Sequence, residues 1–351
     1  MPSDRKTRVL VVDDSAIVRK ILTDALSGQS DLEVVGTAPD PYIARDKILS
    51  LHPDVLTLDI EMPRMDGLTF LKKLMHFRPM PVIVISSLAQ SSCKTAMEAL
   101  SLGAVEVLAK PGGPYSVGEL RLELASKIRA AASAHIRHAP PPPPKAPVHA
   151  PAPPAAAKGY SATIIAIGAS TGGTEAIAAV LPQLPATAPG IVIAQHIPPG
   201  FSRAFAARLN QICAIQVKEA ENGDTLGPGR ALVAPGDFHM VLRRSGDGFR
   251  VEVKTGPRVC YQRPSVDVLF SSVAEAAGAR AVGALLTGMG ADGAQGLLKM
   301  RRAGAHTIAQ DEATCVVFGM PREAIEAGAA ERVVPLPGVA HAILSAAEAR
   351  A

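Results

Sequence analysis

The sequence predicts two α/β units, each built around a mostly parallel sheet, joined by a proline-rich linker. In residues 1–138, five short runs rich in Val, Ile and Leu alternate with helical patterns, which is typical of a parallel sheet with helices on both faces. Residues 139–157 read APPPPPKAPVHAPAPPAAA, a composition that forms an extended spacer rather than a packed core. A ligand for a proline-recognising domain is the less common alternative for such a segment. Residues 158–351 begin with another apolar strand pattern, which leads into a glycine-rich turn.

The composition argues against several classes of protein. The 36 Lys and Arg residues against 32 Asp and Glu residues leave a formal charge of only +4, too little to indicate a nucleic-acid groove. The four cysteines are far apart and form no C-x-x-C pair, so neither a disulfide framework nor a zinc site is indicated. The chain starts with the polar segment MPSDRKTRVL, and no apolar run approaches the roughly 18–20 residues that span a bilayer. We therefore expect a cytoplasmic protein without membrane insertion.

Strands and helices alternate in order along the first unit. Strands are predicted at residues 8–12, 32–36, 54–58, 81–85 and 104–108, and helices at about 16–27, 40–50, 66–76, 91–102 and 116–134. Ligands bind beyond the carboxyl ends of the strands in such sheets. The residues that follow each strand are therefore the candidates for a site.

Acidic and polar residues follow four of these strands. Asp13 and Asp14 follow the first strand, and Asp59 follows the third. Ser86 follows the fourth strand and Lys110 the fifth. Three carboxylates at one edge repel each other unless a cation such as Mg²⁺ lies among them, and a carboxylate beside Mg²⁺ and a lysine can accept a phosphoryl group. Each residue alone is more often a turn or cap residue, but together they predict a phosphoacceptor site, in which Ser86 hydrogen-bonds the phosphoryl oxygens.

The segments VVDDS, LDIEMPRMDGLTFL and AKPGG resemble the signatures of the response-regulator receiver domain, over residues 7–125. The resemblance implies a flavodoxin-like fold, with a CheA-type histidine kinase as the phosphodonor. It also implies that Asp59 is the phosphoacceptor, that Ser86 and Lys110 are the switch residues, and that the Mg²⁺ ligands are Asp13, Asp14, Asp59 and the backbone carbonyl of Glu61.

The second unit begins with a motif that suits a nucleophile. A strand at 163–167 runs into the turn Gly168–Gly173, which reads G-x-S-x-G with Ser170 at its centre. Such a turn lifts a serine hydroxyl over a helix N-terminus, where backbone N–H groups favour an oxyanion or a phosphate. A dinucleotide-binding loop is an alternative, although Ser170 stands where its middle glycine would be. A glycine turn with no chemical role is another.

A nucleophilic serine needs a base and a carboxylate that orients the base. His196 follows the strand pattern IVIAQ, and Asp292 follows an apolar strand at 281–287. If the strands are parallel, Ser170, His196 and Asp292 lie at one edge of the sheet. A lone histidine such as His196 is more often structural than catalytic. His239 is the main alternative candidate for the base. His239, however, lies in a hairpin-like stretch. The chain order Ser, His, Asp also differs from that of the α/β-hydrolases.

The segments GASTGGTEAI, QHIPPGF, APGDFHM, RPSVD and LLTGMGADGA resemble the catalytic domain of the CheB family of chemotaxis protein-glutamate methylesterases, over residues 160–347. The resemblance implies hydrolysis of glutamyl methyl esters on methyl-accepting chemoreceptors with release of methanol, and deamidation of receptor glutamines, without a cofactor. It implies a triad of Ser170, His196 and Asp292, with backbone amides near Thr171 and Met289 as the oxyanion hole. A receiver domain followed by this unit is the family's own architecture. We therefore expect the unphosphorylated receiver to block receptor access to the active site.

The sequence also allows other functions for the second unit. The second unit could be a non-catalytic binding domain in which Ser170 only caps a helix, or a nucleotide-dependent domain. A DNA-binding output is disfavoured because residues 160–351 contain no basic recognition helix.

Overall fold

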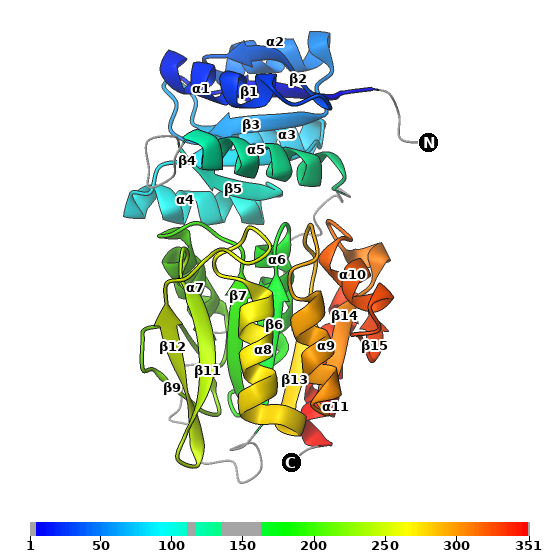
Figure 1. Ribbon diagram of the computed structural model, residues 1–351. Coiled ribbons are helices and arrows are strands. Elements are labelled where there is room, and N and C mark those ends of the chain that lie inside the picture. The colour runs from blue at the N-terminus through cyan, green and yellow to red at the C-terminus, as the bar shows by residue number, and fades with distance from the viewer. Residues whose placement is uncertain (1–4, 111–116, 135–162, 350–351) are drawn as a thin grey trace. The chain divides into compact units, whose positions relative to one another are not determined.

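The computed structural model describes residues 5–110, 117–134 and 163–349. The chain divides into two compact units, Met1–Pro142 and Pro143–Ala351, shown in Figure 1. The predicted linker at 139–157 lies outside the described residues. The expected α/β class, with parallel sheets in both units, is confirmed.

The first unit contains a five-stranded sheet in the order β2-β1-β3-β4-β5, which is the flavodoxin-like order. All of its strand pairs are parallel, and Figure 1 shows helices on both faces of the sheet. The strands are β1 Thr7–Val12, β2 Leu32–Ala38, β3 Val55–Asp59, β4 Val82–Ser86 and β5 Glu106–Ala109. The helices are α1 Ala16–Ser27, α2 Pro41–Leu51, α3 Gly67–Phe77, α4 Gln90–Ser101 and α5 Val117–Ala132.

Side-chain caps explain where three of these helices begin. The Ser15 hydroxyl accepts from an amide of α1, and the carboxylates of Asp40 and Asp66 do the same for α2 and α3. Each cap satisfies an amide that the helix itself leaves unpaired. The strands differ from the prediction in small ways: β5 begins two residues later than expected, and Asp59 and Ser86 end their strands instead of following them.

The second unit contains a seven-stranded sheet in the order β15-β14-β13-β6-β7-β10-β8. Every strand pair in it is parallel. The strands are β6 Ile164–Ala169, β7 Gly190–Gln195, β8 Gln216–Glu219, β10 Arg230–Val233, β13 Ala281–Leu285, β14 His306–Gln310 and β15 Arg332–Val334. The helices are α6 Gly173–Val180, α7 Phe201–Ile212, α8 Val266–Ala277, α9 Ala294–Arg302, α10 Met320–Glu326 and α11 Leu336–Glu348.

A smaller antiparallel sheet completes this unit, with β11 His239–Ser245 and β12 Gly248–Lys254 as a hairpin and β9 Thr225–Leu226 beside it. The hairpin packs against α8. Its buried side chains belong to the same core as those of the parallel sheet.

The central strands β6, β7 and β13 are buried along their whole length. They are neighbours, so their carboxyl ends lie together at one edge of the sheet (Figure 1). Among the described residues, none of the helices combines the length and the hydropathy needed to cross a bilayer.

Candidate active site and phosphoacceptor site

Ser170 follows β6 directly, in a turn that only glycine can complete. Its backbone amide donates to Thr287 O at 3.0 Å, and the Gly173 amide donates to Ser170 O at 2.7 Å. A Cβ on Gly173 would lie 2.2 Å from Gln195 Oε1, and Gly172 has φ +75°. The predicted strand-to-helix turn is thus present. Because the Ser170 and Gly173 amides already have partners, the loop is a poor phosphate cradle.

His196 lies beside Ser170 because their strands are neighbours in register. Ala169 pairs with Gln195 at the ends of β6 and β7, and the His196 amide donates to Ala169 O at 3.2 Å. The residues that follow this pair are Ser170 and His196. Asp292 comes from the loop after β13, which pairs with the other side of β6. The structure therefore brings the three predicted residues to one edge of the sheet.

The imidazole of His196 binds Asp292 through one nitrogen and leaves the other open. His196 Nε2 lies 2.7 Å from Asp292 Oδ2. A carboxylate only accepts hydrogen bonds, so Nε2 carries the proton. Nδ1 is buried and has no hydrogen-bond partner within the described residues. Nδ1 is therefore the basic nitrogen, whereas in the chymotrypsin triad the carboxylate binds Nδ1 and Nε2 is the base.

The Asp292 carboxylate is held by the N-terminus of α8. Oδ1 accepts from Ser265 Oγ at 2.8 Å and from the Asp267 amide at 3.0 Å, and Oδ2 accepts from the Val266 amide at 2.7 Å. Burial raises the pKa of this carboxyl, but the hydrogen bonds from His196 and the α8 amides outweigh burial and hold the pKa below its ordinary value. Asp292 is thus kept ionised, as a partner of an imidazolium must be.

Gln195 fixes the backbones of two of these residues. Its side-chain Nε2 donates to Ser170 O at 2.8 Å and to His196 O at 3.2 Å. Sequence reasoning missed this residue, although its place at the last position of a strand before His196 is a signal. Gln195 keeps the nucleophile turn and the histidine loop together.

The two residues predicted for the oxyanion hole lie in segments that contact each other at Ser170. A Cβ on Gly288 would lie 2.7 Å from Ser170 Cβ, and Met289 is the next residue. Thr171 follows Ser170, and its carbonyl accepts from Thr287 Oγ1 at 3.0 Å. Both predicted residues therefore lie in segments that adjoin Ser170.

His239 occupies a different position from His196, the predicted base. Its Nε2 lies 2.9 Å from Pro257 O, and its Nδ1 accepts from the Ser265 amide at 3.3 Å. Both ring nitrogens are thus bound to the backbone. His239 reaches Asp292 only indirectly, through Ser265, and this contact was not predicted.

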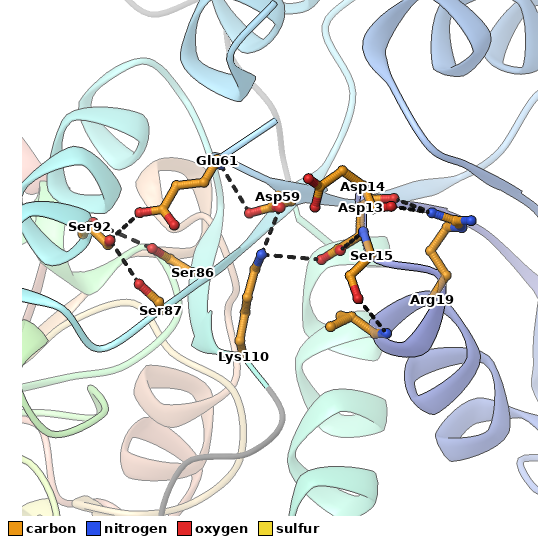
Figure 2. A network of polar contacts seen from close by, with 11 residues as sticks. Asp13, Asp14, Ser15, Arg19, Asp59, Glu61, Ser86, Ser87, Ser92 and Lys110 are labelled. Atoms are coloured by element: carbon orange, nitrogen blue, oxygen red, sulfur yellow. Dashed lines mark hydrogen bonds and ion pairs between the residues drawn. The ribbon is translucent and has the colours of Figure 1, made fainter. Parts of the chain in front are cut away.

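The residues predicted for the phosphoacceptor site meet at the carboxyl ends of β1, β3 and β5 (Figure 2). Lys110 Nζ lies 2.7 Å from Asp59 Oδ2 and 3.7 Å from Asp13 Oδ2. Carboxylate oxygens of Asp13, Asp14 and Asp59 lie within 4.8 Å of one another. Burial and the neighbouring Asp59 raise the pKa of Asp13 to about 6, and burial raises that of Asp59.

The residues present fit a magnesium ion. Asp13 Oδ2 is buried and accepts no hydrogen bond within the described residues, and a cluster of carboxylate oxygens is the donor set that Mg²⁺ takes. The Glu61 side chain turns away from Asp59 and binds Ser92 Oγ (Figure 2). Any role of Glu61 at the ion therefore falls to its backbone carbonyl.

The hydroxyl of Ser86 is engaged with α4 in this structure. Ser86 Oγ donates to Ser92 O at 3.4 Å, and Ser87 Oγ donates to Ser92 Oγ at 2.8 Å (Figure 2). Ser92 was not predicted as part of the site. It links the end of β4, the first turn of α4 and Glu61.

The fold and the two sites define a response regulator with a hydrolase-like output unit. Residues 9–119 match the response regulator receiver domain model, and residues 165–343 match the CheB methylesterase model. The chain belongs to the CheB methylesterase family, which confirms both resemblances found in the sequence.

Curated relatives are similar over nearly the whole chain. The chain is 55% identical over 342 residues to protein-glutamate methylesterase/protein-glutamine glutaminase 2 of Syntrophus aciditrophicus, covering 97% of this chain and 98% of the relative. It is 54% identical to the protein-glutamate methylesterase/protein-glutamine glutaminase of Salmonella choleraesuis, covering 97% of each. The crystal structure of the Thermotoga maritima CheB methylesterase catalytic domain is 38% identical with a TM-score of 0.52, covering 53% of this chain and 98% of that one.

Proposed function

We propose that this chain hydrolyses glutamyl methyl esters on methyl-accepting chemoreceptors and deamidates receptor glutamines, under the control of phosphorylation at Asp59. The observation that carries the proposal is the His196–Asp292 pair, in which Nδ1 of His196 is open. His196 and Ser170 each lie one residue beyond the registered strand pair Ala169–Gln195. The names of the curated relatives support the substrate class. We also propose the boundaries 1–138 for the receiver, 139–157 for the linker and 158–351 for the catalytic domain.

Ester hydrolysis follows from these groups in two steps. Ser170 Oγ attacks the ester carbonyl while His196 Nδ1 takes its proton, and ionised Asp292 stabilises the imidazolium. The imidazolium then gives its proton to the leaving methoxide, which departs as methanol and leaves an acyl-serine. Water hydrolyses the acyl-serine with His196 again as the base, restoring the hydroxyl and releasing the glutamate. With a glutamine substrate the same steps release ammonia.

Backbone amides near Thr171 and Met289 stabilise the oxyanion in this proposal. Donors aimed at a developing oxyanion each contribute roughly 10²–10³ in rate. The proposed chemistry uses no cofactor, since Ser170, His196 and water carry every proton transfer.

In the receiver, Asp59 accepts the phosphoryl group, with a CheA-type histidine kinase as the donor in the cytoplasm. Asp13, Asp14 and the Glu61 carbonyl would hold Mg²⁺, which when bound neutralises the charge that develops during phosphoryl transfer. Lys110, already paired with Asp59, would then contact the phosphoryl oxygens. Ser86 would exchange its bond to Ser92 for one to the phosphoryl group.

The test is methanol release from carboxyl-methylated chemoreceptor membranes by the wild type and by Ser170→Ala. We expect release by the wild type and none above background by the variant. Release that is unaffected by Ser170→Ala would exclude Ser170 as the nucleophile. Ammonia release from receptors that carry glutamine at the same sites tests the deamidase activity.

A further inference from the structure

We infer that the turn at residues 259–262, between β12 and α8, docks the protein segment that carries the glutamyl ester, and that Tyr261 at its tip determines specificity for that segment. We name it the Tyr261 turn. The inference rests on the proposed function and adds to it the surface that recognises the substrate protein.

The backbone of the Tyr261 turn adopts an unfavourable conformation. Val259 and Gln262 exchange two backbone hydrogen bonds, of 3.1 and 2.8 Å. The two residues between them have positive φ angles, 49° for Cys260 and 64° for Tyr261. A two-residue turn with both φ angles positive normally takes Asn or Gly, because a Cβ disfavours this region. Such a conformation persists where the surroundings hold it, and it is common at ligand contacts.

The surroundings hold this turn from both sides. Asp237 Oδ1 accepts from Arg263 Nη2 at 2.7 Å and from Arg258 Nη2 at 3.2 Å. The Asp237 amide donates to Arg263 O at 3.1 Å, and His239 binds Pro257 O. The residues before and after the turn are thus fixed to Asp237 in the loop before β11 and to His239, the first residue of β11. A tip held in this way loses little conformational freedom when it binds a partner.

The two side chains at the tip have different surroundings. Cys260 Sγ lies 4.0 Å from Asp267 Oδ2 and, with carboxylate oxygens of Asp267 and the triad residue Asp292, forms a group whose atoms all lie within 4.8 Å. Cys260 therefore anchors the turn beside the triad carboxylate. Tyr261 is 87% exposed, so the strained turn presents an aromatic ring to solvent close to the active site.

Two further apolar side chains border the same edge. Phe238 lies in the loop after β10 and is 39% exposed, and Met289 lies in the loop after β13 and is 36% exposed. The strands β10 and β13 are parallel members of the sheet that carries Ser170. Exposed side chains thus lie on three different loops, at Phe238, Tyr261 and Met289, and two of these loops follow strands of the sheet that carries Ser170.

The occupant is assigned from the chemistry of the reaction. A methyl ester offers one small apolar group, so it supplies little binding energy of its own, and selection among esters must come from the protein around it. Tyrosine is among the residues that most often dominate protein–protein binding. A fixed tyrosine beside the triad suits the segment that brings the ester to Ser170.

The experiment compares full-length wild type with Tyr261→Ala and Tyr261→Phe, in the presence of a small phosphodonor and Mg²⁺. Methanol release from methylated receptor membranes gives kcat and KM, and hydrolysis of p-nitrophenyl acetate reports the triad without a protein substrate. We expect Tyr261→Ala to raise the receptor KM about tenfold, with kcat and small-ester hydrolysis unchanged. Tyr261→Phe keeps the ring and should restore most of the KM.

The matched control is Ile212→Ala. Ile212 is 46% exposed and ends α7, at the opposite edge of the sheet from the triad. We expect this variant to leave the receptor KM unchanged.

Three outcomes would overturn the inference. An unchanged receptor KM in Tyr261→Ala would show that the turn does not touch the substrate. Higher methanol release without phosphodonor, together with an unchanged KM in its presence, would make the receiver of this chain the occupant. Loss of p-nitrophenyl acetate hydrolysis would assign Tyr261 to the support of the triad. A wild type that hydrolyses the small ester through Ser170 but no receptor ester would instead overturn the proposed function, and with it the assigned partner.

Discussion

His196 Nε2 lies 2.7 Å from Asp292 Oδ2, so Nδ1 is the only imidazole nitrogen that can accept a proton. This arrangement is fixed from outside the pair, because the N-terminus of α8 donates three hydrogen bonds to the same carboxylate. The orientation of the His196 ring therefore depends on the N-terminus of α8, through the Asp292 carboxylate.

Asp292→Asn should lower kcat for methanol release by roughly 10⁴, as loss of the correct tautomer does in the chymotrypsin triad. The Ser265 hydroxyl and the Asp267 amide both donate to Oδ1, so they favour the Asn oxygen at that position. The Asn NH₂ would then face His196 Nε2 and force the proton onto Nδ1. A loss of less than about tenfold, with the fold intact by circular dichroism, would contradict this orientation.

Stability of the catalytic unit should depend on pH through Asp292. Its pKa is below the ordinary value in the folded protein, because the hydrogen bonds from His196 and α8 outweigh burial. The stabilisation is therefore fully present above the unfolded pKa of about 3.9 and is lost as pH falls through the folded pKa. The free energy of unfolding, measured with urea across this pH range, should be higher for the wild type than for Asp292→Asn. This difference should shrink as the pH falls. A difference that grows as the pH falls would contradict a lowered pKa of Asp292 in the folded protein.

Ser265→Ala should lower kcat about tenfold without changing KM. Ser265 Oγ both donates to Asp292 and accepts from the Val268 amide as the cap of α8, and loss of such a cap destabilises by about 1 kcal/mol. Ser272→Ala is the matched control, because Ser272 is a buried serine of α8 that bonds only to backbone groups. It should lower stability and leave kcat unchanged. Equal loss of kcat in both variants would show that α8 acts only through general stability.

Asp13→Asn should weaken Mg²⁺ binding at least tenfold, measured by calorimetry, and should slow phosphorylation of Asp59 by acetyl phosphate. Its buried Oδ2 lies in the carboxylate cluster and accepts no hydrogen bond from the described residues, so replacing it with a neutral amide weakens a candidate ligand. Hydrolysis of p-nitrophenyl acetate through Ser170 should be unchanged by this substitution. Mg²⁺ affinity equal to that of the wild type would exclude Asp13 as a ligand.

The sequence allowed prediction of the strands that carry the sites, because buried parallel strands appear as continuous runs of Val, Ile and Leu. Ser170, His196 and Asp292 could be found because each follows such a run. The contacts of Gln195, Ser265 and His239 could not be predicted, since each depends on how segments far apart in the chain pack together. For the same reason, the sequence does not indicate which nitrogen of His196 binds the carboxylate.

The positive φ angles of Cys260 and Tyr261 were also beyond prediction. Neither residue type favours this conformation, which depends on the ion pairs of Asp237 with Arg258 and Arg263. Local sequence preference indicates an ordinary loop there, and the tertiary contacts override it.

We propose that one chain joins a Ser170 hydrolase to an Asp59 switch. The most direct measurement is methanol release from methylated receptor membranes, with and without acetyl phosphate and Mg²⁺, for wild type, Asp59→Asn and Ser170→Ala. We expect release that the phosphodonor stimulates in the wild type, release that it does not stimulate in Asp59→Asn, and no release by Ser170→Ala. Stimulation that persists in Asp59→Asn would exclude Asp59 as the switch, and release that persists in Ser170→Ala would exclude Ser170 as the nucleophile.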